Sequence, residues 1–188
     1  AVAAGAANPP VLVDETADIP KAAQDILRGA CFDNNVLCIS EKTVFAVEAI
    51  ADRLVLEMQK HGAYLLKGHE AQQVTQLVIK DGHVVGDWVG KDGAAILKAA
   101  GINPPSGTKG SIMQVAFEHP LVKIEQMLPV LPIVTVKDFS EGQRLAFAAE
   151  QGFGHTAIIH SRDVGRIAAF SRKLGTTIVV ANAPSYAS

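Results

Sequence analysis

The sequence predicts an α/β fold in which a mostly parallel sheet carries helices on both faces, in three layers. Short apolar runs rich in β-branched residues alternate along the chain with longer segments whose apolar residues repeat at helical spacing. Glycine, asparagine or aspartate follows the helical segments before the next short run begins. This alternation is typical of strand–helix–strand units, whose strands lie parallel and are buried on both sides.

The individual elements follow from composition and from helix signals. Strands are expected at 10–13, 43–47, 111–117, 131–136, 155–160 and 177–180. Helices are expected at 18–32, 50–61, 70–77, 94–100, 140–151 and 164–174. Asp18 is a good N-cap for the first helix, and Ser140 with Gln143 forms a capping-box pattern. The stretch 63–105 carries the weaker signals and is interpreted as an elaboration between core units.

Length and composition limit the functional classes. A chain of 188 residues is long enough for one sizeable core and short for two, so a single domain over 1–188 is expected. The formal charge of −2 offers no basic excess, so neither nucleic acid nor an anionic membrane surface is an expected partner. No apolar run approaches the roughly 20 residues of a membrane span, and no signal peptide is recognisable, so an intracellular location is expected. The chain lacks an initiating Met, which suggests a piece of a longer polypeptide.

Cys38 is the first candidate for chemistry, because it lies in a polar loop between a helical segment and a strand. A thiolate is a strong nucleophile and can carry covalent catalysis. The alternative is a buried thiol that packs as a small apolar side chain, and residue type alone does not decide between the two. Cys31 continues the apolar stripe of its helix and is expected to be structural. Two cysteines supply neither a disulfide framework nor a zinc site.

His155 is the second candidate, since imidazole transfers protons near neutral pH, although a lone histidine at a strand start can equally be structural. The surrounding hexapeptide 152–157 matches the dinucleotide fingerprint G-x-G-x-x-A. It follows a helix and opens a strand, however, whereas phosphate binding requires the reverse order, so the match is rejected. The other histidines share no ligand spacing, and no metal site is expected.

Glu125 is the third candidate, and it precedes an apolar, proline-bearing run at 126–130. Its carboxylate could accept hydrogen bonds from ribose hydroxyls or could be a solvated loop acid. Both interpretations stay open on the residues alone.

Several segments together, in the same order and spacing, carry a family resemblance. They are 8–18 (NPPVLVDETAD), 32–35 (FDNN) with Cys38 and 41–42, 87–91 (DWVGK), 125–130 (EQMLPV), 154–157 (GHTA) and 182–186 (NAPSY). This set resembles the CoA-acylating aldehyde dehydrogenases, in particular the propionaldehyde and acetaldehyde dehydrogenases of propanediol- and ethanolamine-utilising bacterial microcompartments. The resemblance covers essentially the whole chain.

The resemblance implies a role for each candidate. Cys38 matches the catalytic cysteine, which attacks the aldehyde to give a thiohemiacetal; hydride then passes to NAD, and the resulting thioester is transferred to coenzyme A. Glu125 matches the glutamate that holds the nicotinamide ribose, and Pro129 matches the proline of the same motif. Ile39, beside the nucleophile, is assigned with them to cofactor binding. His155 matches a histidine typical of the acylating branch, and our hypothesis is a proton shuttle near the thioester.

The resemblance also implies what lies beyond the chain. A Rossmann-type NAD-binding domain is expected before residue 1 and an oligomerisation segment after Ser188, so that 1–188 is the catalytic domain alone and inactive in isolation. The full-length protein is then a homo-oligomer in the cytoplasm or inside a microcompartment, with the shell as a further partner.

The resemblance shows two departures near the N-terminus. Hydrolytic relatives carry Glu-Leu-Gly-Gly, with a Glu that activates water, where this chain reads Ala-Gly-Ala-Ala at 4–7. Absence of that base favours thiolysis by CoA over hydrolysis, and the family usually has Gly where Ala7 stands. Two other readings are kept as alternatives: a hydrolytic aldehyde dehydrogenase, and a non-catalytic α/β assembly module with a structural or redox cysteine.

Overall fold

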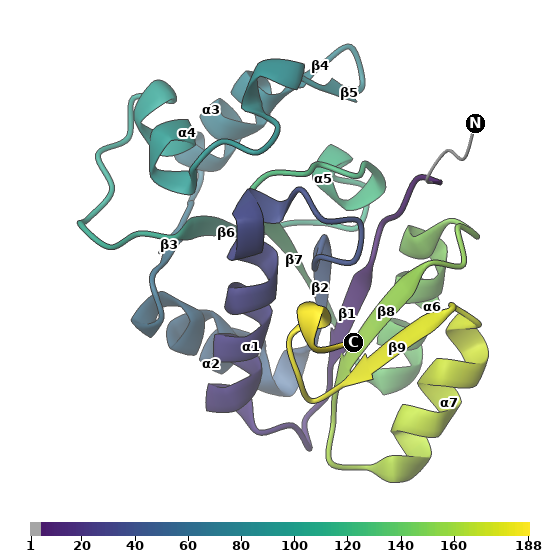
Figure 1. Cartoon of the computed structure of the whole chain (residues 1–188). Helices are drawn as coiled ribbons and strands as arrows, with labels where there is room; N and C mark the ends of the chain where they lie inside the picture. The colour runs from purple at the N-terminus through teal and green to yellow at the C-terminus, as the bar shows by residue number, and fades with distance from the viewer. Residues whose placement is uncertain (1–4) are drawn as a thin grey trace.

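The computed structural model describes residues 5–188 and has a sheet of seven strands at its centre (Figure 1). All neighbouring strands of this sheet are parallel, in the order β3-β6-β7-β2-β1-β8-β9. The strands are β1 (Pro10–Val13), β2 (Thr43–Val47), β3 (Ala63–Leu65), β6 (Gly110–Gln114), β7 (Val130–Val136), β8 (Thr156–His160) and β9 (Ile178–Ala181). The expected class, an α/β fold around a parallel sheet, is confirmed.

Helices cover both faces of this sheet. The main ones are α1 (Ile19–Cys31), α2 (Glu48–Lys60), α6 (Phe139–Glu150) and α7 (Val164–Leu174). Helices α1 and α2 connect strands in the direction of β3, and α6 and α7 connect strands in the direction of β9. Because crossovers between parallel strands are right-handed, opposite winding directions place the two helix pairs on opposite faces, as Figure 1 shows. The three expected layers are confirmed.

Helix α1 begins where its sequence predicts. The Asp18 side chain accepts a hydrogen bond from the backbone N–H of Lys21 at 3.4 Å, and Pro20 occupies the first turn, where its missing N–H costs nothing. The apolar side chains of the helix face the sheet and are buried. Its last residue is Cys31, so α1 delivers the chain directly to the loop that carries Cys38.

The N-cap of α6 lies two residues earlier than predicted. The N-cap is Asp138, whose Oδ1 accepts the N–H of Glu141 at 2.9 Å, while Glu141 Oε2 accepts the N–H of Lys137 at 2.7 Å. Ser140 and Gln143 lie inside the helix, so the prediction of Ser140 as the cap was wrong. Both pairs fit the same spacing rule, and the pair with an aspartate cap and a charged acceptor occupies the helix start.

The stretch between β3 and β6 forms the expected elaboration. It holds α3 (His69–Val78), a two-stranded hairpin of β4 (Ile79–Lys80) and β5 (His83–Val84), a short helix η2 (Gly86–Trp88) and α4 (Gly93–Ala99). These elements surround a second apolar cluster, separate from the main core, that includes Val74, Ile96 and Leu97. The strand β3, the hairpin and the short helix α5 (Pro120–Lys123) were not predicted, because each is too short to show a periodic pattern.

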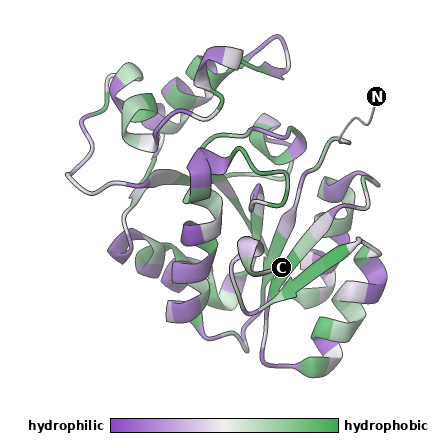
Figure 2. Cartoon of the chain, viewed as in Figure 1, coloured by the Kyte–Doolittle hydropathy of each residue, from purple (hydrophilic) through white to green (hydrophobic). Residues whose placement is uncertain are grey.

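The main core lies on both faces of the central strands. Figure 2 shows the apolar residues gathered on the strands and polar residues on the outer helix surfaces. All residues of β1, β2 and β8 are buried, as expected for strands covered on two sides. Within residues 5–188, no helix is both long and apolar enough to span a membrane.

Candidate active site

The amino ends of four adjacent strands bring the candidate residues to one end of the sheet, which we call the rim. Cys38 precedes β2, Glu125 precedes β7, His155 directly precedes β8, and the segment 5–9 enters β1. These strands are neighbours in the order β7-β2-β1-β8 and run parallel, so their amino ends lie side by side. With strands about 4.8 Å apart, the four entries span roughly 15 Å. The sheet topology therefore places all three candidates on one rim.

A strained turn precedes Cys38. Three consecutive non-glycine residues in η1 (Phe32–Asn35), namely Asp33, Asn34 and Asn35, have φ values of 46°, 50° and 68°. Asparagine and aspartate are the side chains that tolerate this left-handed region best, and even they adopt it at a cost. Asn35 is buried, and its Nδ2 donates to the carbonyls of Ala30 at 2.8 Å and Glu41 at 3.0 Å. The amide thus ties the end of α1 to the end of the Cys38 loop.

A buried lysine fills the inside of that loop. Lys42 Nζ donates to Asn35 O at 2.8 Å, to Asn35 Oδ1 at 2.6 Å and to Leu37 O at 3.3 Å. Lys42 is fully buried and is the only lysine or arginine classed as buried between residues 5 and 188. Burial lowers the pKa of Lys42 to about 8, against the opposing charges of Glu125, Cys38 and Glu41. The side chain is therefore mainly cationic at neutral pH, directly behind the turn that carries Cys38.

The neighbouring Glu41 fixes the C-terminal end of the described chain to the same loop. Its carboxylate is fully buried and accepts two hydrogen bonds from Ser185, from N–H at 2.9 Å and from Oγ at 2.7 Å. Burial raises the pKa of Glu41 to about 7, although the Ser185 hydrogen bonds act in the opposite direction. Gly29 on α1 leaves space for this carboxylate, because a Cβ at position 29 would lie 2.0 Å from Glu41 Oε2. The turn η3 (Ser185–Ala187) is thereby held against the Cys38 loop.

Glu125 contacts the entry to β1. Its Oε2 accepts the backbone N–H of Ala7 at 3.2 Å, and its side chain is half-buried. The next residue, Gln126, is buried and donates from Nε2 to the carbonyl of Lys42 at 2.7 Å. Ala7 is fully buried and is not among the residues with positive φ, so alanine is accommodated where the family usually has glycine. Ala4, which stands where hydrolytic relatives carry the glutamate, lies outside the described residues.

Gly90 joins the Cys38 loop to the Glu125 loop, a role that the sequence did not reveal. Its carbonyl accepts Asn34 Nδ2 at 3.0 Å, and its N–H donates to Met127 O at 3.0 Å. Its φ is +69°, and a Cβ would lie 3.0 Å from Val36 Cγ1. The only available signal was the occurrence of Gly90 in the family-like segment 87–91, which says nothing about its partners.

His155 lies at the far side of the β1 entry from Glu125. Its backbone N–H donates to Glu150 Oε1 at 3.1 Å, and its Nδ1 is 2.8 Å from Thr156 Oγ1. The side chain is half-buried and lines a cavity of about 270 Å³ that Gly5 and Ala6 also line. The order helix, glycine turn, strand at 150–156 confirms that this hexapeptide is not a dinucleotide-binding turn. Within the described residues, no hydrogen bond joins His155 to Cys38.

The remaining predicted positions are more passive in this structure. Ile39 is half-buried in the turn that follows Cys38. Pro129 is buried, and its carbonyl accepts the N–H of Ser111 at 2.9 Å, which joins β7 to β6. Their contribution to cofactor binding stays a prediction. Cys31 packs against the main core, and burial raises the pKa of its thiol to about 12, which fits the structural role expected for it.

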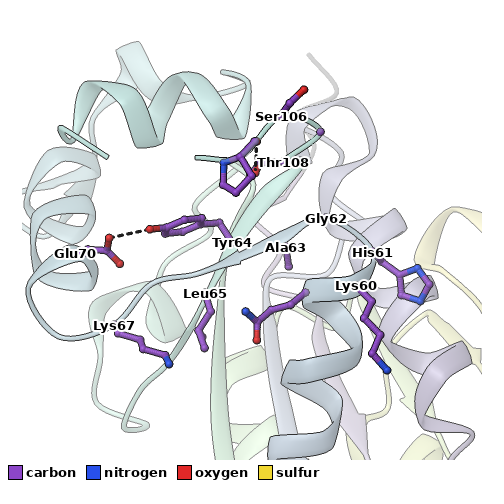
Figure 3. Close-up of a pocket in the computed structure, with 13 residues that line it drawn as sticks. Lys60, His61, Gly62, Ala63, Tyr64, Leu65, Lys67, Glu70, Ser106 and Thr108 are labelled. Atoms are coloured by element: carbon purple, nitrogen blue, oxygen red, sulfur yellow. Dashed lines mark hydrogen bonds between the residues drawn. The ribbon is translucent and has the colours of Figure 1, made fainter. Parts of the chain in front are cut away.

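The cavities show which surfaces remain open around the site. One cavity, of about 730 Å³, runs along β3 and away from the candidate residues; Figure 3 shows Tyr64 in it, with its hydroxyl donating to Glu70 at 2.8 Å. A second, about 580 Å³, borders the turn before Cys38 and is lined by Phe32 and Tyr186, whose ring centroids are 4.8 Å apart. Across residues 5–188, no cluster of three or more histidine, cysteine or acidic side chains could hold a metal ion.

A model of the aldehyde dehydrogenase family matches residues 2–188 of this sequence. The chain belongs to the aldehyde dehydrogenase family. The family expected from the sequence is therefore confirmed, and with it the type of domain to which the parallel sheet belongs.

Several aldehyde dehydrogenases are similar to this chain in sequence or in structure. The propanal dehydrogenase (CoA-propanoylating) of Citrobacter freundii is 45% identical over 187 residues, which are 99% of this chain and 41% of the relative. The acetaldehyde dehydrogenase (acetylating) of Salmonella typhimurium is 41% identical over 192 residues, with coverage of 99% and 41%. The Rhodopseudomonas palustris propionaldehyde dehydrogenase, solved with bound propionyl-CoA, superposes with a TM-score of 0.96 at 44% identity, covering 98% of this chain and 41% of that one. The present chain thus spans about two fifths of the length of these relatives.

The structure fits the dinucleotide that this family implies. Glu125 Oε2 accepts a hydrogen bond from the N–H of Ala7. Glu125 Oε1 has no hydrogen-bond partner among the described residues and is not fully buried. One carboxylate oxygen on a half-buried side chain is thus available to a ribose hydroxyl donor. Carboxylate recognition of a ribose is the function that the family resemblance implies for this position.

Proposed function

We propose that this chain is the catalytic domain of an NAD-dependent CoA-acylating aldehyde dehydrogenase that converts propionaldehyde or acetaldehyde to the acyl-CoA. The observation that carries the proposal is the position of Cys38. It follows a strained turn fixed by Asn35 and Lys42, and shares its rim with Glu125, in a chain of the aldehyde dehydrogenase family. The similar enzymes from Citrobacter freundii and Salmonella typhimurium are CoA-propanoylating and acetylating, which supports acyl-CoA as the product.

The chemistry that this chain supplies is nucleophilic. The Cys38 sulfur attacks the aldehyde carbon as the thiolate, and the electron pair of the C=O bond moves to the oxygen, which gives the alkoxide of a thiohemiacetal. The backbone N–H of Cys38 is proposed as one donor to that oxygen. Glu125 would hold the ribose of NAD, and NAD bound there would accept the hydride from the former aldehyde carbon, which leaves a thioester on Cys38. The thiolate of CoA then attacks this thioester, and Cys38 leaves as the thiolate, ready for the next cycle.

His155 is proposed as the proton carrier for the thioester step. It lies on the same rim and carries its imidazole half-exposed beside the cavity with Gly5 and Ala6. In the Clostridium phytofermentans propionaldehyde dehydrogenase, two variants have been solved, one with a cysteine and one with a histidine replaced by alanine. The two replaced positions are separated by almost the same number of residues as Cys38 and His155, which supports pairing these two in function.

The whole protein is proposed to hold more than this chain. It would include an NAD-binding domain on the amino-terminal side and an oligomerisation segment, for which relatives more than twice as long leave room, and it would lie in the cytoplasm or a bacterial microcompartment. One similar solved enzyme comes from a fucose-utilisation microcompartment of Clostridium phytofermentans. We expect the 188-residue chain alone to be inactive and to bind NAD weakly. A micromolar dissociation constant for NAD, measured by calorimetry on this chain, would contradict the proposal that a separate domain binds NAD.

The test of the proposed function uses the full-length protein and the Cys38→Ala variant. NADH formation from propionaldehyde is expected to require CoA and to disappear in Cys38→Ala, while Cys31→Ala retains it. Product formed without CoA would assign the protein to the hydrolytic enzymes. Aldehyde oxidation retained in Cys38→Ala, together with alkylation of Cys38 no faster than that of an unstructured thiol, would favour a non-catalytic module instead.

A further inference from the structure

The buried ammonium of Lys42 has no part in the chemistry described above. A lysine is rarely fully buried, because burial removes its charge from water. Fully buried lysines are found where the ammonium is paired or has a function. In residues 5–188, Lys42 is the only lysine or arginine in this situation. Its three hydrogen-bond acceptors all belong to the loop that leads to Cys38.

These contacts hold the loop in its unusual shape. Asn35, which receives two of the three hydrogen bonds, ends the run of three left-handed residues. Leu37, which receives the third, is the residue directly before Cys38. A strained turn persists only when its surroundings fix it at several points, and the ammonium provides three of those points. The position of the Cys38 backbone therefore depends on Lys42.

The positive charge of Lys42 also has no ion-pair partner in direct contact among the described residues. Within the described residues, no carboxylate lies within 4.0 Å of Lys42 Nζ, because its acceptors are two carbonyl oxygens and an amide oxygen. The adjacent Glu41 carboxylate points to Ser185 instead. The charged groups that act on the ammonium include Glu125 and Cys38. A buried charge without an ion-pair partner acts strongly on nearby groups, since little water screens it.

We propose that Lys42 is a positioning residue for Cys38: its ammonium holds the 35–37 turn beneath the nucleophile and supplies a positive charge that attracts anionic reagents to the site and stabilises the oxyanion formed on attack. This inference rests on the proposed role of Cys38 as the nucleophile. Lys42 then has two separable effects. One is geometric and acts through Asn35 and Leu37, and the other is electrostatic and acts on anions that form or react at Cys38.

The test compares two alkylating reagents of similar size, neutral iodoacetamide and anionic iodoacetate, on Cys38 in the full-length protein. Mass spectrometry of the peptide gives each rate. Lys42→Met removes the charge, so the iodoacetate-to-iodoacetamide rate ratio is expected to fall at least about twofold, which is the effect that one unit charge about 8 Å away would have even with the dielectric constant of bulk water. Asn35→Ala loosens the turn but keeps the charge, so both rates should fall while their ratio stays. A loss of packing alone would not move the ratio.

The controls separate this proposal from misfolding and from the proposed function. Lys109→Met removes an exposed cation that acts on Cys31, and the Cys38 ratio should stay unchanged. The Cys31 thiol is partly buried and its pKa is raised to about 12, so it should react slowly in the folded chain, and fast alkylation of Cys31 identifies any variant that unfolds. Lys42→Gln then replaces Lys42→Met, and Lys42→Arg should retain the wild-type ratio. An unchanged ratio in a folded Lys42→Met or Lys42→Gln variant would overturn the electrostatic role of Lys42 and leave the function of Cys38 untouched. Activity retained in Cys38→Ala would overturn the function instead.

Discussion

Replacing Glu41 by glutamine should change how folding stability depends on pH. Glu41 is fully buried between Gly29 and Ser185, and burial raises its pKa from 4.5 to about 7. A carboxyl group with a raised pKa binds its proton more tightly in the folded state than in the unfolded chain. It therefore contributes most to stability below the unfolded pKa, and this contribution is lost as pH rises through the folded pKa. Glutamine stays neutral at every pH and lacks this dependence.

The magnitude follows from the size of the shift. One pKa unit corresponds to about 1.4 kcal/mol, so the full difference amounts to about 3 kcal/mol, of which about 2 kcal/mol falls between about pH 5 and pH 7. The wild type should lose this amount relative to Glu41→Gln over that interval. Lys42 should disturb the comparison little, since its pKa of about 8 lies above the interval and Glu41 is the weakest of the charges that raise that pKa.

Urea unfolding at a series of pH values measures this difference directly. Linear extrapolation gives the free energy of unfolding of each protein, and the difference between the two is plotted against pH. Ser185→Ala is the matched control: it keeps the carboxyl group and removes the Oγ donor that favours the charged form, so its stability should fall more steeply with pH than that of the wild type. If the difference in unfolding free energy between wild type and Glu41→Gln stayed constant over this pH range within about 0.5 kcal/mol, the pKa of Glu41 would not be raised, because a change of that size lies within the error of such extrapolations.

Two glycines test the construction of the Cys38 loop. Gly29→Ala, which in an ordinary helix would stabilise, is expected to destabilise by about 2 kcal/mol or more, because its Cβ would lie 2.0 Å from Glu41 Oε2; thermal unfolding checks the sign, and an increase in Tm would be contrary to expectation. Gly90→Ala should cost about 1–2 kcal/mol, because its φ is +69° and its Cβ would lie 3.0 Å from Val36 Cγ1. Gly86→Ala, with no atom within 4 Å of its Cβ, is the control and should change stability by less than about 0.5 kcal/mol; equal losses in Gly90→Ala and Gly86→Ala would show that the predicted contact has no effect.

The parallel sheet was predictable because long periodic patterns determine it. Helix α1 has an aspartate cap, a proline in its first turn and a continuous apolar stripe, and each signal agrees with the others. Strand β3 and the β4–β5 hairpin are two or three residues long, and their pairing depends on the long-range packing of the second apolar cluster. Such elements leave no local signal. The cap of α6 was misplaced for a related reason, since two overlapping residue pairs both satisfy the capping rule.

The chemistry of the site was predictable only in part. Cys38, Glu125 and His155 could be named from residue type and family resemblance, and the strand order then explains why they share one rim. The supporting residues could not be named in the same way. The partners of Lys42 and Gly90 follow from a left-handed turn, which leaves no mark in hydrophobic periodicity. Side chains that position a nucleophile are thus visible only in three dimensions.

Acyl transfer from propionyl-CoA to Cys38 tests whether Cys38 is the nucleophile, because it isolates the covalent step and needs no NAD. The full-length protein is incubated with propionyl-CoA, and digestion followed by mass spectrometry locates the acyl group. We expect a propionyl thioester on Cys38, with release of free CoA and with no acyl group on Cys31, whose partly buried thiol has its pKa raised to about 12. Absence of the adduct from Cys38, or equal acylation of Cys31 and Cys38 in the folded protein, would contradict it.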